Sequence, residues 1–148
     1  MAQATPLYQI RLALRTELSD LNAGDTVIVA VSGGADSSSL AAALLQEAKE
    51  RAIRVIAVII DHALQANSAD VAQNTKVELS KMGYENIEIK RIKVEVTDGV
   101  EASARRARYA ALNEIADSVN AVAIFLGHTK DDQAETVLLG LARGSGTR

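Results

Sequence analysis

The strongest chemical signal in the sequence is a short loop of glycine and small polar residues. Its members are Ser32, Gly33, Gly34, Ala35, Asp36 and Ser37. Two adjacent glycines allow a tight turn that brings backbone N–H groups against an anion, and both serines can donate hydroxyl groups to phosphate oxygens. Asp36 can hold a metal ion or cap a helix. The pattern predicts an anion-binding loop, although an ordinary strand-to-helix turn with a polar cap uses the same residue types.

Two familiar phosphate loops are excluded by the residues around this turn. A Walker loop requires Gly-Lys followed by Ser or Thr, and no lysine stands between Ser32 and Leu40. A dinucleotide-binding loop requires three spaced glycines, which are also missing. The loop is therefore expected to bind phosphate in a different manner.

A second group of polar residues follows the last apolar run of the chain. His128 stands just past this run, where an imidazole has either a catalytic or a structural role. Thr129 and Asp132 have the spacing of a capping box, which predicts a helix over Asp131–Ala142. Asp132 and Glu135 then share one face of its first turns. Two carboxylates there can take a metal ion or a substrate ammonium group, or they complement the helix dipole.

Two arginines are predicted to face the core near the start of a helix over Val100–Val119. The apolar stripe of this helix steps back from Leu112 to Arg108 and then to Arg105. Guanidinium groups that point inward need an anionic partner, which can be a phosphate or a buried carboxylate. Arg106 is about 100° away around the helix and is expected to meet solvent.

The elements that must position these residues alternate along the chain. Apolar runs rich in β-branched residues predict strands over Thr26–Val31, Val55–Ile60 and Ala121–Leu126. The segment Ile87–Val96 has a phase slip and interleaved basic residues, which predicts a bulged strand at a sheet edge. Amphipathic segments predict helices over Leu7–Leu21, Ser38–Arg51, Ser68–Met82, Val100–Val119 and Asp131–Ala142. This alternation predicts an α/β fold, a parallel sheet with helices on both faces.

Ligands of such sheets bind at the carboxyl ends of the strands. The glycine-rich loop follows one predicted strand directly, and Asp61 and His62 end the next. His62 can be catalytic or structural, and a lone histidine after a strand is more often structural. Asp98 and Glu101 have the spacing of the N-cap and N3 residues of the helix that carries the arginines. All these groups are therefore expected near one edge.

Length and composition fit one folded domain over residues 1–148. The net charge is −3. There is no cysteine, so disulfides, thiolate nucleophiles and cysteine ligands of iron–sulfur clusters are excluded. The longest apolar runs cover six residues, whereas a membrane-spanning helix needs about 20, and no signal peptide is visible. We expect a cytoplasmic protein without a membrane partner. A nucleic-acid substrate would need a local basic patch or a segment outside this chain.

The glycine-rich loop resembles the pyrophosphate loop of the N-type ATP pyrophosphatases, the PP-loop enzymes. Four segments resemble one subgroup of them, the tRNA(Ile)-lysidine synthetases, and keep its order and spacing. These segments read VSGGADS, DHAL, EASARRARYAAL and GHTKDDQAETVLLGLARGSG. The resemblance runs from Val27 to Gly146 and implies a Rossmann-like PP-loop domain of the adenine nucleotide alpha hydrolase type.

The resemblance also implies an activity and roles for the residues. The family adenylates the wobble cytidine of a tRNA(Ile) with a CAU anticodon, and free L-lysine then displaces AMP to give lysidine. Ser32–Ser37 would bind ATP, Asp36 would help to hold Mg²⁺, and Arg108, or else Arg105, would stabilise the activated nucleotide. Asp132 and Glu135 would hold the lysine amine. A homodimer is one possible assembly, which the sequence does not decide.

The chain departs from the family pattern in two places. Gln65 stands where the family usually has a basic residue after the DHAL stretch. The turn-rich segment Arg143–Arg148 terminates no element, so we expect the front of a longer protein whose C-terminal part recognises tRNA. The alternatives are another PP-loop enzyme that thiolates tRNA or amidates its substrate, and a nucleotide-binding module without catalysis. The thiolating relatives generally use cysteine, which this chain lacks.

Overall fold

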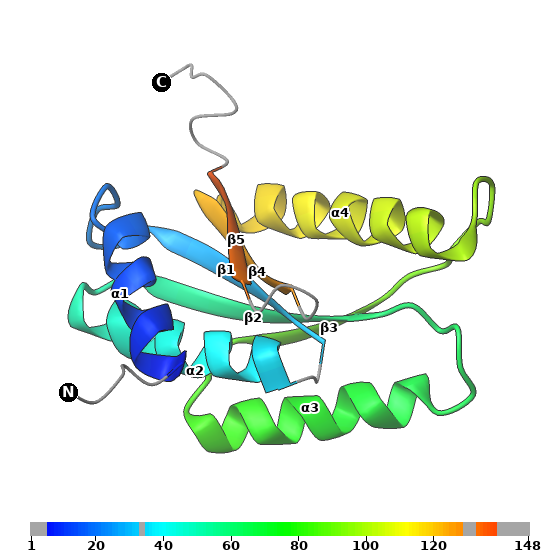
Figure 1. Ribbon diagram of the computed structural model, residues 1–148, viewed down its shortest axis with the longest axis horizontal. Coiled ribbons are helices and arrows are strands. Elements are labelled where there is room, and N and C mark those ends of the chain that lie inside the picture. Colours follow the sequence, from blue (N-terminus) through cyan, green and yellow to red (C-terminus); the bar gives the residue numbers. More distant parts are fainter. Residues whose placement is uncertain (1–5, 33–34, 129–132, 139–148) are drawn as a thin grey trace.

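The computed structural model of the protein describes residues 6–32, 35–128 and 133–138 (Figure 1). In chain order the elements are α1 (Pro6–Leu18), β1 (Thr26–Val31), α2 (Ala35–Glu50), β2 (Arg54–Asp61), α3 (Ser68–Met82), β3 (Ile87–Arg91), α4 (Val100–Val119), β4 (Ala123–His128) and β5 (Gln133–Leu138). Among these described elements, no helix is long and apolar enough to cross a membrane.

The strands form one sheet in the order β3-β2-β1-β4-β5. The first four are parallel, and β5 runs antiparallel to β4. β1 lies in the middle and is covered on both faces, which explains why its sequence TVIVAV is apolar without alternation. The predicted α/β fold with a parallel sheet is confirmed.

Successive residues of the central strands enter two different cores. Val27, Val29 and Phe125 pack with α1, α2 and α3, whereas Ile28 and Ile124 pack with α4. The buried side chains that α4 contributes are Leu112, Ile115 and Ala116. Figure 1 shows α4 alone on one side of the sheet and the other helices on the opposite side. The first turns of α4 extend past the ends of the strands.

The helix predicted over Asp131–Ala142 is wrong where the structure describes it. Gln133–Leu138 forms β5, with His128 opposite Gln133 and Ala123 opposite Leu138. A free edge of β4 offers hydrogen-bonding groups to a returning chain, and this pairing outweighs local helical signals. The β-branched pair Thr136 and Val137 suits a strand.

The predicted bulged strand over Ile87–Val96 is also corrected. β3 does lie at the edge of the sheet, but it ends at Arg91. The N–H of Ile92 then donates to the carbonyl oxygen of Asp61 at 2.9 Å, and the chain leaves the sheet. The phase slip in the sequence marks the end of the strand and not a bulge.

An ionic cluster fastens α1 to α2. The side chain of Glu47 is fully buried and accepts hydrogen bonds from Arg11 (2.6 Å), Arg15 (3.2 Å) and Arg51 (3.0 Å). Burial raises the pKa of Glu47, but the hydrogen bonds from the three guanidinium groups outweigh it and leave the pKa below its ordinary value. Glu47 is therefore ionised at neutral pH.

Replacing this buried carboxylate should destabilise the domain. Glu47→Gln is expected to lower the free energy of unfolding by about 2 kcal/mol at neutral pH, because partly exposed arginines lose their buried anion. Since the folded pKa is lowered, the stabilisation is complete above the ordinary value of 4.5 and is lost as pH falls through the folded value. Urea titrations of both proteins at neutral and acidic pH measure this.

Glu50→Gln is the matched control for this measurement. Glu50 is exposed and lies 3.5 Å from Arg11, so its loss should change the free energy of unfolding by less than about 0.5 kcal/mol. Equal losses in the two variants would contradict the assignment of the cluster to Glu47.

Candidate active site

The carboxyl ends of β1 and β2 meet at one edge of the sheet, because the two strands are parallel neighbours. Val31 and Ile59 are register partners there. The loop that begins at Ser32 and the loop that begins at His62 therefore leave the sheet at the same edge, which is the edge where ligands of parallel sheets bind. This shared location confirms the sequence prediction for the two loops.

Two serines hold the first loop together. The backbone N–H of Ser32 donates to Oγ of Ser37 at 3.1 Å, and the two hydroxyl oxygens lie 3.1 Å apart. Ser37 is buried whereas Ser32 is exposed. Ser37 thus joins the two ends of the loop, and Ser32 stands at the surface where a ligand can reach it.

Helix α2 begins at Ala35, inside the predicted loop, and not at Ser38. The unsatisfied N–H groups of its first turn belong to the loop and favour an anion there. Asp36 lies in this first turn, where the backbone alone is described, and Gly33 and Gly34 lie outside the described residues. In the sequence, the N-terminus of α2 therefore follows Gly33 and Gly34 directly.

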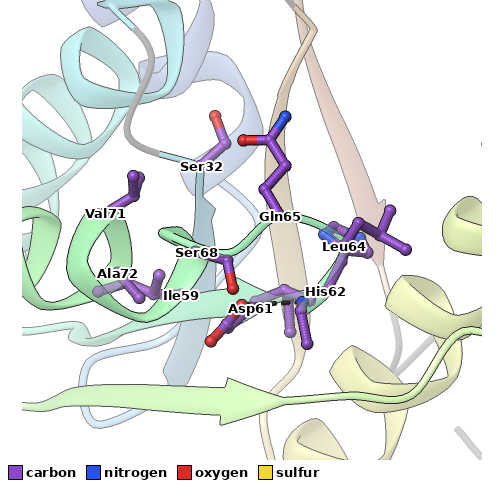
Figure 2. Close-up of a pocket in the computed structure, with 11 residues that line it drawn as sticks. Ser32, Ile59, Asp61, His62, Leu64, Gln65, Ser68, Val71 and Ala72 are labelled. Atoms are coloured by element: carbon purple, nitrogen blue, oxygen red, sulfur yellow. Dashed lines mark hydrogen bonds between the residues drawn. The ribbon is translucent and has the colours of Figure 1, made fainter.

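A pocket of about 230 Å³ opens beside Ser32 and the loop that follows β2. Its apolar lining includes Ile59, Leu64, Val71 and Ala72. Figure 2 shows the amide of Gln65 and the hydroxyl of Ser32 directed the same way, while Ser68 is turned toward Asp61. The pocket therefore combines an apolar wall with uncharged hydrogen-bonding groups next to the anion loop.

Asp61 organises the loop after β2. Its buried carboxylate accepts hydrogen bonds from the hydroxyl of Ser68 and, at 2.9 Å, from the backbone N–H of Ala63. These two hydrogen bonds lower the pKa of Asp61 more than burial raises it. Ala63 has a left-handed backbone with φ 57°, which is unfavourable for a residue with a Cβ. The ionised carboxylate holds this turn in place.

His62 is half-buried beside Arg108. Burial lowers the pKa of His62, and the positive charge of Arg108 lowers it further against the attraction of Asp61. The imidazole is therefore neutral at pH 7. Arg108 is half-buried on α4, as its position on the apolar stripe predicted, and its charge acts on the loop after β2.

The other predictions for the start of α4 need correction. Arg105 is exposed and not turned inward; it stacks 4.9 Å from the ring centre of Tyr109 and donates to its hydroxyl at 3.1 Å. The overhanging first turns of α4 lack a sheet beneath them, so the apolar stripe has nothing to bury there. Arg106 is exposed, as predicted.

The N-cap of α4 is Gly99 and not Asp98. Asp98 binds Arg106 through both carboxylate oxygens, at 2.7 and 2.8 Å, because a guanidinium group offers two parallel donors. Hydrogen bonds from Arg106 are the main reason that the pKa of Asp98 falls to about 2. Glu101 remains in the first turn of the helix.

Of the predicted acidic pair Asp132 and Glu135, the structure describes only the backbone of Glu135. Glu135 lies in β5 opposite Leu126 of β4, so it does not share a helix face with Asp132. Asp132 lies outside the described residues, as does Thr129, and for His128 and Glu135 the backbone alone is described. His128 ends β4 at the carboxyl edge, as expected.

A family model described as PP-loop domain matches residues 8–148. This chain belongs to the PP-loop family. It is 48% identical over 97% of its length to the tRNA(Ile)-lysidine synthase of Thermobifida fusca, and covers 44% of that protein. It is 51% identical over 82% of its length to the synthase of Streptomyces coelicolor, and covers 35% of it. The chain thus spans less than half the length of these curated relatives.

A solved structure with the same fold supports the architecture of this PP-loop domain. The U34-tRNA thiolase NcsA from Methanococcus maripaludis superposes with a TM-score of 0.67 at 20% identity, over 86% of this chain and 46% of that one. A likeness at this identity concerns the fold alone.

Sequence reasoning missed the hydrogen bonds that shape the second loop of the PP-loop domain. Ser68 was predicted only as the start of a helix, and Ala63 was assigned no role. Asp61 accepts from Ala63 and Ser68 across a turn. The hydrophobic periodicity of the sequence does not predict the geometry of such a turn. A carboxylate that ends a buried strand shortly before a serine at a helix start is the signal that could have found it.

The coupling between Asp61 and Ala63 is testable in the PP-loop domain. Asp61→Asn should lower the free energy of unfolding by about 2 kcal/mol, because the amide oxygen is neutral and accepts more weakly than a carboxylate, and the amide nitrogen cannot accept at all. Adding Ala63→Gly should restore about 1 kcal/mol, since glycine adopts the left-handed turn without the carboxylate. Urea titrations of the single and double variants form a double-mutant cycle.

Ala52 provides the control, because it has the same φ of 57° in a different turn. Ala52→Gly should have the same effect with and without Asp61. If Ala63→Gly proves equally additive, then Asp61 does not hold the turn at Ala63.

Proposed function

We propose that the chain is the catalytic domain of an enzyme that joins free L-lysine to C2 of the wobble cytidine in a tRNA(Ile) with a CAU anticodon. The observation that carries this proposal is the 48% and 51% identity to proteins named tRNA(Ile)-lysidine synthase. The cytidine O2 attacks the α-phosphorus of ATP and pyrophosphate leaves. The ε-amine of lysine then attacks C2, loses a proton and displaces AMP, which leaves lysidine.

The loop after β1 is the proposed site for the phosphates of ATP. The hydroxyl of Ser32 is exposed, and the N-terminal turn of α2 offers backbone N–H groups from Ala35 onward. Ser37 is tied to the backbone of Ser32 and so keeps the loop closed. A loop whose donors are already placed stabilises the charge that develops as pyrophosphate leaves.

Mg²⁺ is the metal that fits the residues of this loop. Mg²⁺ prefers oxygen ligands and is commonly held by one or two carboxylates together with substrate phosphates. Within the described part of the chain, no group of three or more metal-ligating side chains gathers, and the loop contributes one carboxylate, Asp36, beside hydroxyl groups. Asp36 would hold the ion, which when bound neutralises phosphate charge.

The pocket next to the loop is the proposed place for the nucleoside of ATP. Its volume of about 230 Å³ and its apolar wall suit a flat ring, and it opens beside Ser32. No lysine or arginine stands among the described residues that line it, and the carboxylate of Asp61 is already hydrogen-bonded to Ala63. These features favour a heterocycle over a further phosphate group.

Arg108 is the proposed electrostatic partner of the activated nucleotide. It lies on α4 close enough to His62 to lower the pKa of that imidazole, and a phosphate at the carboxyl edge would be attracted by the same charge. Arg105 is the weaker candidate, because it is exposed and stacked on Tyr109. His128, at the end of β4, is the candidate for a proton carrier at the second step.

Asp132 and Glu135 are proposed to hold the lysine amine. A free lysine amine has a pKa of about 10.4, so at neutral pH it is an ammonium group that cannot attack. Carboxylates would bind the ammonium and accept its proton as the attack begins. Support for this pair comes from the matching sequence GHTKDDQAETVLLGLARGSG and not from a shared helix face. A cytoplasmic location and a homodimer are proposed with the activity.

Replacing Asp36 tests the proposed metal role. In the protein that carries this chain, Asp36→Asn should slow pyrophosphate release with tRNA and lysine by at least about a hundredfold. Asp20→Asn, which changes an exposed carboxylate after α1, serves as the control and should leave the rate unchanged. If Asp36→Asn stays within a few-fold of wild type and loses only about 1 kcal/mol of stability, Asp36 is a helix cap.

A comparison of adjacent carboxylates tests the lysine site. Asp132→Asn should leave adenylation of the tRNA intact and block transfer to lysine, because the amide cannot accept the ammonium proton. Asp131→Asn is the matched control and should retain both steps. Release of pyrophosphate and incorporation of labelled lysine separate the two half-reactions. Loss of both steps in Asp132→Asn would point to a metal or folding role.

A further inference from the structure

A second hollow lies at the carboxyl edge, next to the proposed ATP pocket. It measures about 470 Å³ and is formed by the loop 62–64 on one side and the segment 91–94 on the other. We call it the β2–β3 groove. The loop 62–64 also lines the ATP pocket, so the two hollows share one wall. β2 lies between β1 and β3 in the sheet, and the groove is on the β3 side.

The β2–β3 groove presents positive charge at the surface. Arg91 and Lys93 line it and are both exposed, and neither forms an ion pair with any residue that the structure describes. Asp61 attracts Arg91, but its carboxylate is buried and already accepts two hydrogen bonds. Lys90, the neighbouring cation, is bound to Glu114 of α4 at 3.2 Å. Two cations therefore remain available in the groove.

Apolar side chains accompany these cations. Leu64 stands on the shared wall with half of its surface exposed (51%), although leucine is a residue that usually avoids water. Ile92 and Val94 are half-buried along the opposite wall. Exposed cations next to exposed apolar groups have the chemistry that single-stranded nucleic acid requires, because phosphates meet the cations and unstacked bases meet the apolar surface.

We propose that the β2–β3 groove binds the single-stranded anticodon loop of the RNA substrate, with Arg91 and Lys93 on its phosphates and Leu64 against a base. The proposal rests on the proposed function, since that function requires a loop nucleotide to reach the ATP pocket. The shared wall at His62–Leu64 connects the two hollows directly. A chain of carboxylates alone would satisfy the cations but offers no apolar surface to Leu64.

The groove also explains how a chain of negative net charge could bind RNA. The net charge of −3 gives no general attraction for RNA, so the cations must be concentrated where the substrate binds. Two phosphate contacts are enough to orient a loop but supply little total affinity. The groove therefore positions the reacting nucleotide without holding a whole tRNA tightly.

The test measures binding of a CAU anticodon stem-loop RNA to the 148-residue chain. Fluorescence anisotropy is recorded from about 50 mM to about 200 mM salt. The double variant Arg91→Gln/Lys93→Gln should bind at least about tenfold more weakly at low salt, and its slope of log K against log salt should fall by about 1.4, the value for two single-strand phosphates. Mg-ATP binding should stay within about twofold, because both cations lie outside the ATP pocket.

A matched control removes the same charges elsewhere. Lys49 and Arg54 are exposed and line a different pocket, at the amino end of β2, so Lys49→Gln/Arg54→Gln lowers the net charge equally. This control should bind the stem-loop as the wild type does. Equal weakening by both double variants, or none by the groove variant, overturns the proposal. So does a fully paired duplex, or a polyglutamate peptide, that binds with the same dependence on Arg91 and Lys93.

The groove and the proposed function can fail separately. If the groove variant weakens stem-loop binding while the protein that carries this chain forms no lysidine, the groove stands and the function is wrong. If lysidine forms and the groove variant leaves kcat/KM for the tRNA unchanged, the function stands and the groove is overturned. Loss of Mg-ATP binding in the groove variant also overturns the proposal, because the residues then belong to the nucleotide pocket.

Discussion

The parallel pairing of β1 with β2 is the constraint on which the rest of the molecule depends. Parallel neighbours end at the same edge, so the loops that begin at Ser32 and His62 must emerge together. Each loop must also be followed by a helix that returns the chain to the opposite edge. The start of α2 therefore lies at the same edge as the end of β1, and the start of α3 places Ser68 within reach of Asp61. A site at this edge is a consequence of the topology before any side chain is considered.

Two buried carboxylates stabilise opposite ends of this arrangement by different means. Glu47 is neutralised by three guanidinium groups and joins two helices. Asp61 is satisfied by a hydroxyl and a backbone N–H, and shapes a loop. The arginines around Glu47 are all bound to this buried carboxylate and have a structural role. The second carboxylate leaves its surroundings positive, since Arg91 and Arg108 act on the edge without being the main partners of Asp61. Charge at the site is thus available for substrates.

The sequence was sufficient for elements whose signals are local. β1, α3 and α4 begin and end where their apolar runs and stripes predict. The anion loop, too, is recognisable from its two glycines and two serines. β5 was missed because the helical signals at Thr129 and Asp132 outweighed the β-branched pair Thr136 and Val137, and the pairing with β4 that decides the structure is not a local propensity. The exposure of Arg105 depends on how far α4 overhangs the sheet, which is set by the whole packing of α4. The Asp61 network and the β2–β3 groove need three-dimensional proximity between separate segments.

One feature of the loop 62–64 has a thermodynamic consequence. Because the same three residues form a wall of both hollows, a ligand that immobilises the loop in one hollow changes the affinity of the other for its own ligand. Linkage requires this change to be reciprocal: each ligand alters the binding of the other by the same factor. Asp61 already holds the backbone at Ala63, so this coupling passes through the side chains of His62 and Leu64, which line both hollows. Two ligands seated in these two hollows would be coupled through one turn of three residues, without any movement of the sheet.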